Sequence, residues 1–155
     1  MAAHGDQRYG TQPYVAHLDA VANIASAYGD EASVIAYLHD VLEDTAVTVE
    51  AIESAFGQRV ARCVTLVTDA PGTHRAARKA GTNAKLRQVG VADQVALIVK
   101  ASDRLANLRA CVADARPALL TMYQGEHAAF RAAVYRRGLC DELWRELDTI
   151  ASKPL

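Results

Sequence analysis

The chain of 155 residues is the length of one domain around a single core, since chains of this size bury about two-thirds of their unfolded surface. Hydrophobic residues make up 51% of it and charged residues 23%, with four Pro and nine Gly, which excludes a disordered chain, a collagen-like repeat and a coiled-coil fibre. Three scattered cysteines predict neither a disulfide framework nor a thiolate zinc site, so we expect small buried cysteines in a reducing cytosol. No segment approaches the roughly 18 continuous apolar residues of a membrane span, which predicts a cytoplasmic protein without a membrane partner.

The formal charge of −1 hides an uneven distribution along the chain. Residues 1–69 carry ten acidic and three basic side chains, whereas residues 70–155 carry fourteen basic and eight acidic ones. Such an asymmetry within one domain predicts a site with anions on one wall and cations on another. A chance distribution of surface charge is the alternative at this point. The slightly acidic whole and the lack of aromatic residues within the basic segment argue against nucleic-acid binding.

Apolar residues spaced three and four apart predict helices along most of the chain, without alternating strands. Pro13 opens the first helix, Gly29 ends it, Asp30 caps the second and Thr48 caps the third. Residues 69–73 read as a loop. The expected helices span residues 13–28, 30–42, 49–56, 59–68, 74–89, 92–113, 117–135 and 139–150. The prediction is one all-α domain over residues 1–155, a bundle of seven or eight helices.

Residues 38–45 hold the polar side chains that most indicate chemistry. On a helix His39 and Glu43 lie four residues apart, as do Asp40 and Asp44, so all four are expected along one side of a segment that is otherwise apolar. Polar groups placed in this way cost free energy unless something compensates them. A divalent metal ion would compensate them well.

Four residues on three predicted helices offer a matching set of metal donors. His39 and Asp40 supply one nitrogen and one oxygen, and His17 and Asp103 supply a second of each. Two imidazoles and two carboxylates suit manganese, iron or another hard-to-borderline divalent ion better than zinc, which prefers thiolates. Taken singly, each has an ordinary explanation, such as a surface histidine or a salt bridge between Asp103 and Arg104. The order His, His-Asp, Asp favours a metal site.

This order resembles that of the HD phosphohydrolase superfamily, and further motifs resemble the hydrolase domain of RelA/SpoT-type enzymes. The matching motifs are Ala3–Gln7, Pro13–His17, His39–Thr45, Ile52 with Phe56-Gly57, and Lys100–Leu108. The resemblance covers roughly residues 3–135 and implies an HD-type helical bundle. It also implies a metal-dependent hydrolase that removes the 3′-pyrophosphate of ppGpp, pppGpp or pGpp. Because a synthetase or regulatory domain has no room here, we expect a stand-alone small alarmone hydrolase.

The resemblance also implies roles for individual residues. The ligands of a manganese ion, or of another divalent metal, would be His17, His39, Asp40 and Asp103. Glu43 and Asp44 would orient or deprotonate the attacking water, and Glu43 is the better base because it lies a turn beyond His39. The structural alternatives are an exposed helix-end acid for Glu43 and a helix cap for Asp44.

Phosphate groups require cations beyond the metal. Arg75, Arg78 and Lys79 fall on adjacent helical turns, where they could clamp a pyrophosphate, and the resemblance implies the same role. Lys85 and Arg87 are equally consistent with a solvated basic face.

Three further residues complete the predicted nucleotide site. The resemblance implies that Arg8 packs on the guanine and that Asn107 contacts the nucleotide. Tyr123 borders the nucleotide pocket in one interpretation and packs in the core in the other.

The chain departs from the family pattern at Tyr9, Leu18 and Gly81, which leaves the exact substrate open. One alternative keeps the chemistry but acts on an adenosine alarmone or on the 2′-phosphate of NADPH. Another is a sensor that binds a nucleotide without turnover, against which the acidic pair Glu43-Asp44 argues. The expected partner is a small nucleotide, and the oligomeric state, a homodimer included, is left open.

Overall fold

The structure, a computed structural model, describes residues 8–9 and 12–153, with side chains from Pro13 onward. Two antiparallel strands of two residues each, β1 (Arg8–Tyr9) and β2 (Gln12–Pro13), precede the first helix. The α-helices are α1 (Tyr14–Ala25), α2 (Asp30–Leu38), α3 (Val41–Asp44), α4 (Val49–Phe56), α5 (Gln58–Val67), α6 (Arg75–Arg87), α7 (Gln94–Ala113), α8 (Pro117–Val134) and α9 (Asp141–Ala151). Short 3₁₀ helices, η1 (Ser26–Tyr28) and η2 (Val91–Asp93), follow α1 and precede α7. The predicted all-α bundle is confirmed.

Most helix ends follow the local signals in the sequence. Thr48 caps α4 as predicted, because its hydroxyl accepts a hydrogen bond from the Ala51 N–H at 3.3 Å. Gly57, at a φ of 89°, ends the same helix in a conformation that side chains disfavour. The prediction for Asp30 is wrong by one position, since Gly29 precedes α2 and Asp30 is its first residue.

The second predicted helix is divided in two at the most polar segment of the chain. It ends at Leu38, Asp40 has a φ of −106° and a ψ of 1°, and a separate turn, α3, follows. Inside the break, Nδ1 of buried His39 lies 2.6 Å from the Ala36 carbonyl, the group that a continued helix would offer to the Asp40 N–H. The expectation that His39, Asp40, Glu43 and Asp44 share one side of a single helix is therefore wrong.

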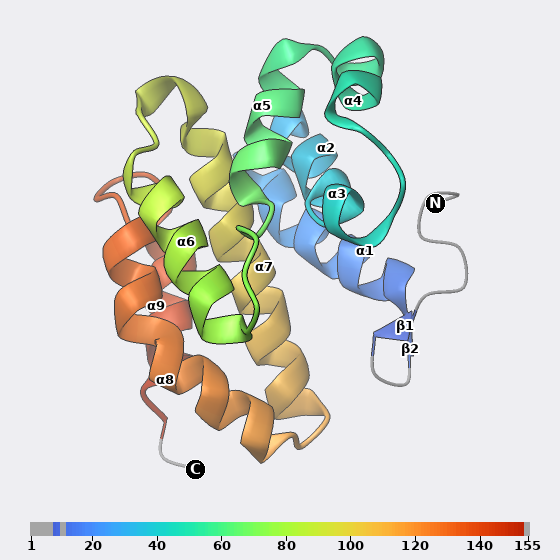
Figure 1. Ribbon diagram of the computed structural model, residues 1–155. Coiled ribbons are helices and arrows are strands. Elements are labelled where there is room, and N and C mark those ends of the chain that lie inside the picture. The colour runs from blue at the N-terminus through green and yellow to red at the C-terminus, as the bar shows by residue number, and fades with distance from the viewer. Residues whose placement is uncertain (1–7, 10–11, 154–155) are drawn as a thin grey trace.

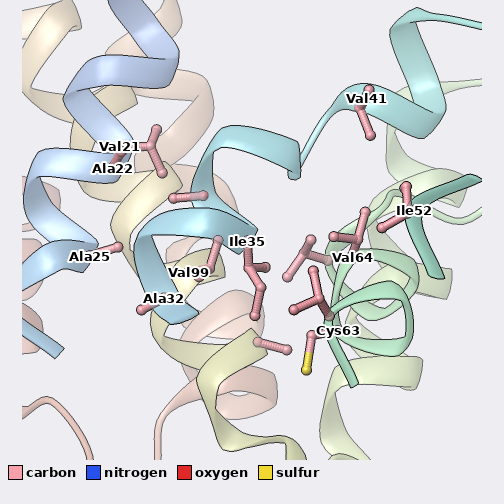
Figure 2. Packing of buried hydrophobic residues seen from close by; sticks show 14 of the residues in the cluster. Val21, Ala22, Ala25, Ala32, Ile35, Val41, Ile52, Cys63, Val64 and Val99 are labelled. Carbon is pink, nitrogen blue, oxygen red and sulfur yellow. The ribbon is translucent and has the colours of Figure 1, made fainter. Parts of the chain in front are cut away.

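Helix α7 is the shared wall of two hydrophobic clusters. Ala96, Val99 and Ala106 of α7 pack with α1, α2 and α5, as Figure 2 shows for Val99 beside Ile35. The opposite side of α7 packs with α8 and α9 around Trp144. In Figure 1, α1 to α5 accordingly lie on one side of α7, and α6, α8 and α9 lie on the other.

The three cysteines, Cys63, Cys111 and Cys140, are buried and unpaired, as the sequence predicts. Among the helices of the described ranges, none combines the length and the apolar character needed to cross a membrane.

Candidate active site

Two histidines and an aspartate meet where α1, the end of α2 and α7 converge. One donor atom each from His17, His39 and Asp103 lies within 4.8 Å of the others. Asp103 Oδ1 is 3.2 Å from Nε2 of His17 and 3.6 Å from Nε2 of His39. Asp40 stands beside this group, with its Oδ2 3.1 Å from Nε2 of His39. The tertiary structure thus brings together all four predicted metal ligands.

The environment of His39 fits a metal ligand. Its Nδ1 donates to the Ala36 carbonyl, which leaves Nε2 to face the carboxylates. Nε2 is buried 3.1 Å from Asp40 Oδ2 and 3.6 Å from Asp103 Oδ1, and it has no hydrogen bond of good geometry among the described residues. A divalent cation between this nitrogen and the carboxylates would satisfy all of them. The mixed nitrogen and oxygen donors suit a borderline divalent ion.

The charges of this cluster shift one another's pKa values. Burial lowers the pKa of His39, but the nearby Asp40 and Asp103 carboxylates outweigh that effect and raise it to about 9. Burial raises the pKa of Asp103, but its contacts with His17, His39 and Lys100 hold it well below the usual range. Burial also raises the pKa of Asp40, and its contacts with His39 outweigh this and lower it. Both carboxylates therefore stay ionised at neutral pH, as metal coordination requires.

The two predicted catalytic acids are in different environments. Glu43 lines the cavity that also contains His17, Asp40 and Asp103, and its Oε1 accepts a hydrogen bond from the Asp69 N–H at 2.6 Å. Burial raises the pKa of Glu43, which makes its carboxylate a stronger base. Both residues are exposed on α3, but Asp44 is not one of the residues lining that cavity. It does not cap α4 either, because Thr48 does.

The cavity has a volume of about 280 Å³ and joins the acidic and basic halves of the chain. Its lining residues are Tyr14, His17, Asp40, Glu43, Asp69, Arg75, Arg78, Lys79, Lys100, Asp103 and Asn107. The first five come from residues 1–69 and the other six from the rest of the chain. Both halves of the chain thus line one cavity, as the uneven charge distribution predicts, although Asp103 comes from the basic half. The acidic wall consists of Asp40 and Glu43 with the histidines, and the basic wall consists of Lys100 and the three predicted phosphate-binding cations, Arg75, Arg78 and Lys79.

These three cations differ in how far protein carboxylates already neutralise them. Arg75 donates to both oxygens of Glu126, at 2.7 and 3.1 Å. Lys79 Nζ is 2.5 Å from Asp69 Oδ2. Arg78 has no carboxylate partner in the described part of the chain. Arg78 is therefore the cation whose charge is most available to a bound anion.

The other two basic residues of α6 lie outside this cavity. Lys85 donates to the backbone carbonyls of Thr65 and Thr68, at 2.8 and 2.6 Å, and so links α6 to α5. Arg87 is exposed at the end of α6. The solvated-face interpretation holds for Arg87, whereas Lys85 has a structural role.

A second cavity of about 460 Å³ continues from the first between α6, α7 and α8. The two share five lining residues, among them Asp103 and Asn107. Asn107 Nδ2 donates to Asp103 Oδ1 at 2.8 Å, so its amide also orients a candidate ligand. Tyr123 lines the second cavity and packs against the hydrophobic cluster around Trp144. The Arg104 guanidinium lies over the Tyr123 ring, 4.8 Å from the ring centroid. Tyr123 therefore packs against the core and also lines a cavity, and its place beside a nucleotide stays a prediction.

Four residues of this site had no role in the sequence analysis, namely Tyr14, Asp69, Lys100 and Glu126. The Tyr14 hydroxyl donates to Asp40 Oδ2. Lys100 is buried, and its Nζ is 3.4 Å from Asp69 Oδ1 and 4.0 Å from Asp103 Oδ2. Glu126 binds Arg75 across the second cavity. The sequence does show Lys100 as a single charged residue in the apolar run 95–101, which indicates a buried lysine. Its partners Asp69 and Val67 could not be predicted, because they come from a distant part of the chain.

The prediction for Arg8 lies outside the described side chains. Its backbone pairs with Pro13 in the two-residue sheet before α1. A contact of Arg8 with a nucleotide base stays a prediction.

Comparison with known proteins places the chain in a family. The HD domain family model matches residues 1–129, which is most of the chain. The chain therefore belongs to the HD domain family.

Curated relatives carry the names of alarmone enzymes. The guanosine-3′,5′-bis(diphosphate) 3′-pyrophosphohydrolase of Aquifex aeolicus is 37% identical over 109 residues, which cover 68% of this chain but only 16% of that protein. The pyrophosphohydrolase MESH1 of Danio rerio is 39% identical over 114 residues, 68% of this chain and 61% of that protein. The chain thus spans about a sixth of the first relative and under two-thirds of the second.

Solved structures share the fold. A metazoan ortholog of SpoT, described as hydrolysing ppGpp, aligns with a TM-score of 0.75 and 26% identity over 96% of this chain and 87% of that one. A protein of Listeria monocytogenes EGD-e aligns with a TM-score of 0.71 and 23% identity, covering 90% of this chain, and supports the fold alone.

Proposed function

We propose that this protein is a metal-dependent phosphohydrolase that removes the 3′-pyrophosphate from guanosine alarmones such as ppGpp, pppGpp or pGpp. The observation that carries the proposal is one cavity lined by Glu43, by the candidate ligands His17, Asp40 and Asp103, and by Arg75, Arg78 and Lys79. The fourth candidate ligand, His39, lies beside Asp40 and Asp103. Membership of the HD domain family and the names of the relatives support the reaction class.

His17, His39, Asp40 and Asp103 would hold the metal, and we propose manganese because the donors are two nitrogens and two carboxylates. When bound, a divalent ion lowers the pKa of a water molecule and offsets the negative charge of phosphate oxygens. The Asp40 carboxylate is oriented by the Tyr14 hydroxyl, and Asp103 by Asn107. These contacts restrict the ligands to orientations that face the cavity.

In this mechanism Glu43 takes the proton of the attacking water. Its Oε1 accepts the Asp69 N–H, which directs Oε2 to the proton. Asp44, exposed on the same turn, would help to orient the water, although it does not line the cavity. Arg78, with Lys79 and Arg75, would bind the pyrophosphate and stabilise the charge that develops on it as the bond to the 3′ oxygen breaks.

The test is release of pyrophosphate from ppGpp by purified protein supplied with Mn²⁺. We expect turnover by the wild type, its loss in His39→Ala and Asp103→Ala, and a large loss in Glu43→Gln with the metal still bound. Glu146→Gln, which alters the Arg109 ion pair at the surface, should keep full activity.

A panel of nucleotides separates the substrates. We expect a lower kcat/KM for each of the two alternative substrates, an adenosine alarmone and NADPH, than for ppGpp. Absence of turnover of ppGpp, pppGpp and pGpp by fully metallated protein would refute the proposal, and unchanged ppGpp bound tightly would indicate a sensor instead.

A further inference from the structure

Asp69 connects the two walls of the cavity although neither the metal nor the phosphate clamp requires it. It is the second residue after α5, in the loop that leads to α6, and its side chain is only 11% exposed. Its backbone contacts the acidic wall and its side chain contacts the basic wall. Such a position suits a residue that fixes others in place.

Cations from two helices fix the Asp69 side chain. Lys79 of α6 is 2.5 Å from Oδ2, and Lys100 of α7 is 3.4 Å from Oδ1. The Thr82 hydroxyl, also on α6, is 3.3 Å from Oδ1. Lys100 Nζ in addition donates to the Val67 carbonyl at 2.8 Å, which ties it to the end of α5. A carboxylate held by two ammonium groups has little freedom to move.

The rest of the loop is held close to α6 as well. The Ala70 N–H donates to the Thr82 hydroxyl at 2.8 Å. Gly81 allows this approach, because a Cβ at that position would come within 2.8 Å of the Ala70 Cβ. The backbone of Asp69 is therefore positioned by contacts that do not involve Glu43.

The Asp69 N–H makes the hydrogen bond that orients Glu43, at 2.6 Å from Oε1. Glu43 lies on α3, a single turn of four residues. An isolated turn has little stability of its own, because the first hydrogen bond of a helix fixes several residues. The direction of the Glu43 carboxylate therefore depends on the loop.

We propose that Asp69 is a positioning residue that transmits the placement of Lys79 and Lys100 to the Glu43 carboxylate. Its side chain is anchored by the basic wall, and its backbone N–H holds the base towards the metal ligands. The role in turnover rests on the proposed function, whereas the linkage itself can be measured without any turnover.

A double-mutant cycle tests the role in turnover. Asp69→Asn keeps the size of the side chain but removes the charge that Lys79 and Lys100 hold. We expect kcat to fall about tenfold or more, because the hydrogen bond that orients the charged Glu43 carboxylate is weakened. KM should not rise, since Lys79 remains available to phosphate. In a Glu43→Gln background Asp69→Asn should lower kcat no further.

The matched control is Asp93→Asn, which breaks a comparable ion pair with Arg62 away from the cavity and should leave kcat unchanged. An equal fold-loss of kcat from Asp69→Asn with and without the Glu43 carboxylate would overturn the proposal, because it would show a general structural effect.

Amide hydrogen exchange of the metal-free protein tests the linkage itself. Glu43→Ala should accelerate exchange of the Asp69 amide about tenfold or more, because its acceptor is lost. The Ala70 amide, bonded to Thr82, should keep its protection and is the internal reference. Unchanged protection at Asp69 would overturn the proposal. If the wild type turns over no alarmone, the proposed function is refuted. Hydrogen exchange still tests whether the Asp69 N–H is held by the Glu43 carboxylate.

Discussion

His39 shows how one buried side chain combines structural and chemical roles. Its Nδ1 donates to the Ala36 carbonyl at the point where α2 ends, and its Nε2 faces Asp40 and Asp103. The same contact that accompanies the end of the helix therefore also sets the direction of the nitrogen that we propose as a metal ligand. Such a second hydrogen bond is the usual way in which proteins orient an imidazole ligand.

The pKa of His39 predicts how metal affinity depends on pH. Because neighbouring carboxylates raise it to about 9, the ring of the metal-free protein is protonated at pH 7, and a metal must displace that proton. Affinity for Mn²⁺ should rise about tenfold per pH unit between roughly pH 6.5 and 8.5. Isothermal titration calorimetry in buffers of different ionisation enthalpy measures both affinity and proton release.

The stability of the metal-free protein changes with pH in the opposite direction to its metal affinity. The folded-state pKa of His39 lies above the unfolded value of about 6.5. Protonated His39 therefore stabilises the metal-free fold fully below about pH 6.5, and this stabilisation is lost as the pH rises through 9.

The control for the affinity prediction is His127→Gln, which alters a histidine paired with Asp148 and should preserve the pH dependence of Mn²⁺ affinity. A constant affinity over this range would contradict the prediction.

Arg78 is expected to contribute more to anion binding than its neighbours, since no protein carboxylate in the described ranges competes for it. Arg78→Met should weaken binding of inorganic pyrophosphate about tenfold or more, and the loss should shrink at high salt. Arg87→Met, a change of the same type on the exposed end of α6, is the control and should have little effect. Equal losses in the two variants, measured by calorimetry, would show that only the net charge matters.

At the scale of elements, the packing of α6 on the loop after α5 decides where the basic wall stands. Gly81 is in the interior of α6, where alanine would ordinarily stabilise the helix by about 1 kcal/mol. Here the added Cβ would lie 2.8 Å from the Ala70 Cβ, so the helix and the loop would have to separate. The close approach explains why glycine stands at this position.

We therefore expect Gly81→Ala to destabilise the protein by about 1 kcal/mol or more, opposite in sign to helix propensity. Urea denaturation measures the free energy of unfolding. Ala70→Gly in the Gly81→Ala background removes the clashing methyl group and should restore most of the loss. A Gly81→Ala protein as stable as the wild type would mean that the loop can move at no cost.

Over the whole molecule, the proposed metal site joins α1 and the junction of α2 and α3, which lie on one side of α7, to α7 itself. His17 comes from α1, His39 and Asp40 from the junction of α2 and α3, and Asp103 from α7 itself. A bound ion thus links three segments that are far apart in the sequence. Unfolding separates these ligands, so metal binding and folding are coupled.

The expected consequence is a rise in melting temperature with metal. At a free Mn²⁺ concentration of about one hundred times Kd the stabilisation is roughly 2.7 kcal/mol, or about 5–10 °C for a domain of this size. A chelator should reverse it. Scanning calorimetry of wild type and His39→Ala gives the comparison, because the variant should melt at the same temperature with and without Mn²⁺. A similar rise in His39→Ala would place the ion elsewhere.

Helix positions could be predicted from sequence because they depend on neighbours in the chain. Thr48 and Gly57 bound α4 through local hydrogen bonds and backbone conformation, and the pattern predicted the same limits. The break after Leu38 could not be predicted in this way, because it accompanies burial of His39 among residues from α1 and α7. Periodicity alone therefore extended that helix too far.

The sequence by itself determined the all-α class, the four candidate ligands and the charge asymmetry, since residue types and their spacing are sufficient for these. Only the tertiary structure decided which charges remain available. Arg75 and Lys79 are paired with Glu126 and Asp69, whereas Arg78 has no such pair within residues 13–153. Ion pairs depend on distances of a few ångströms between elements remote in sequence. The role of Asp69 likewise arises from its place between two walls.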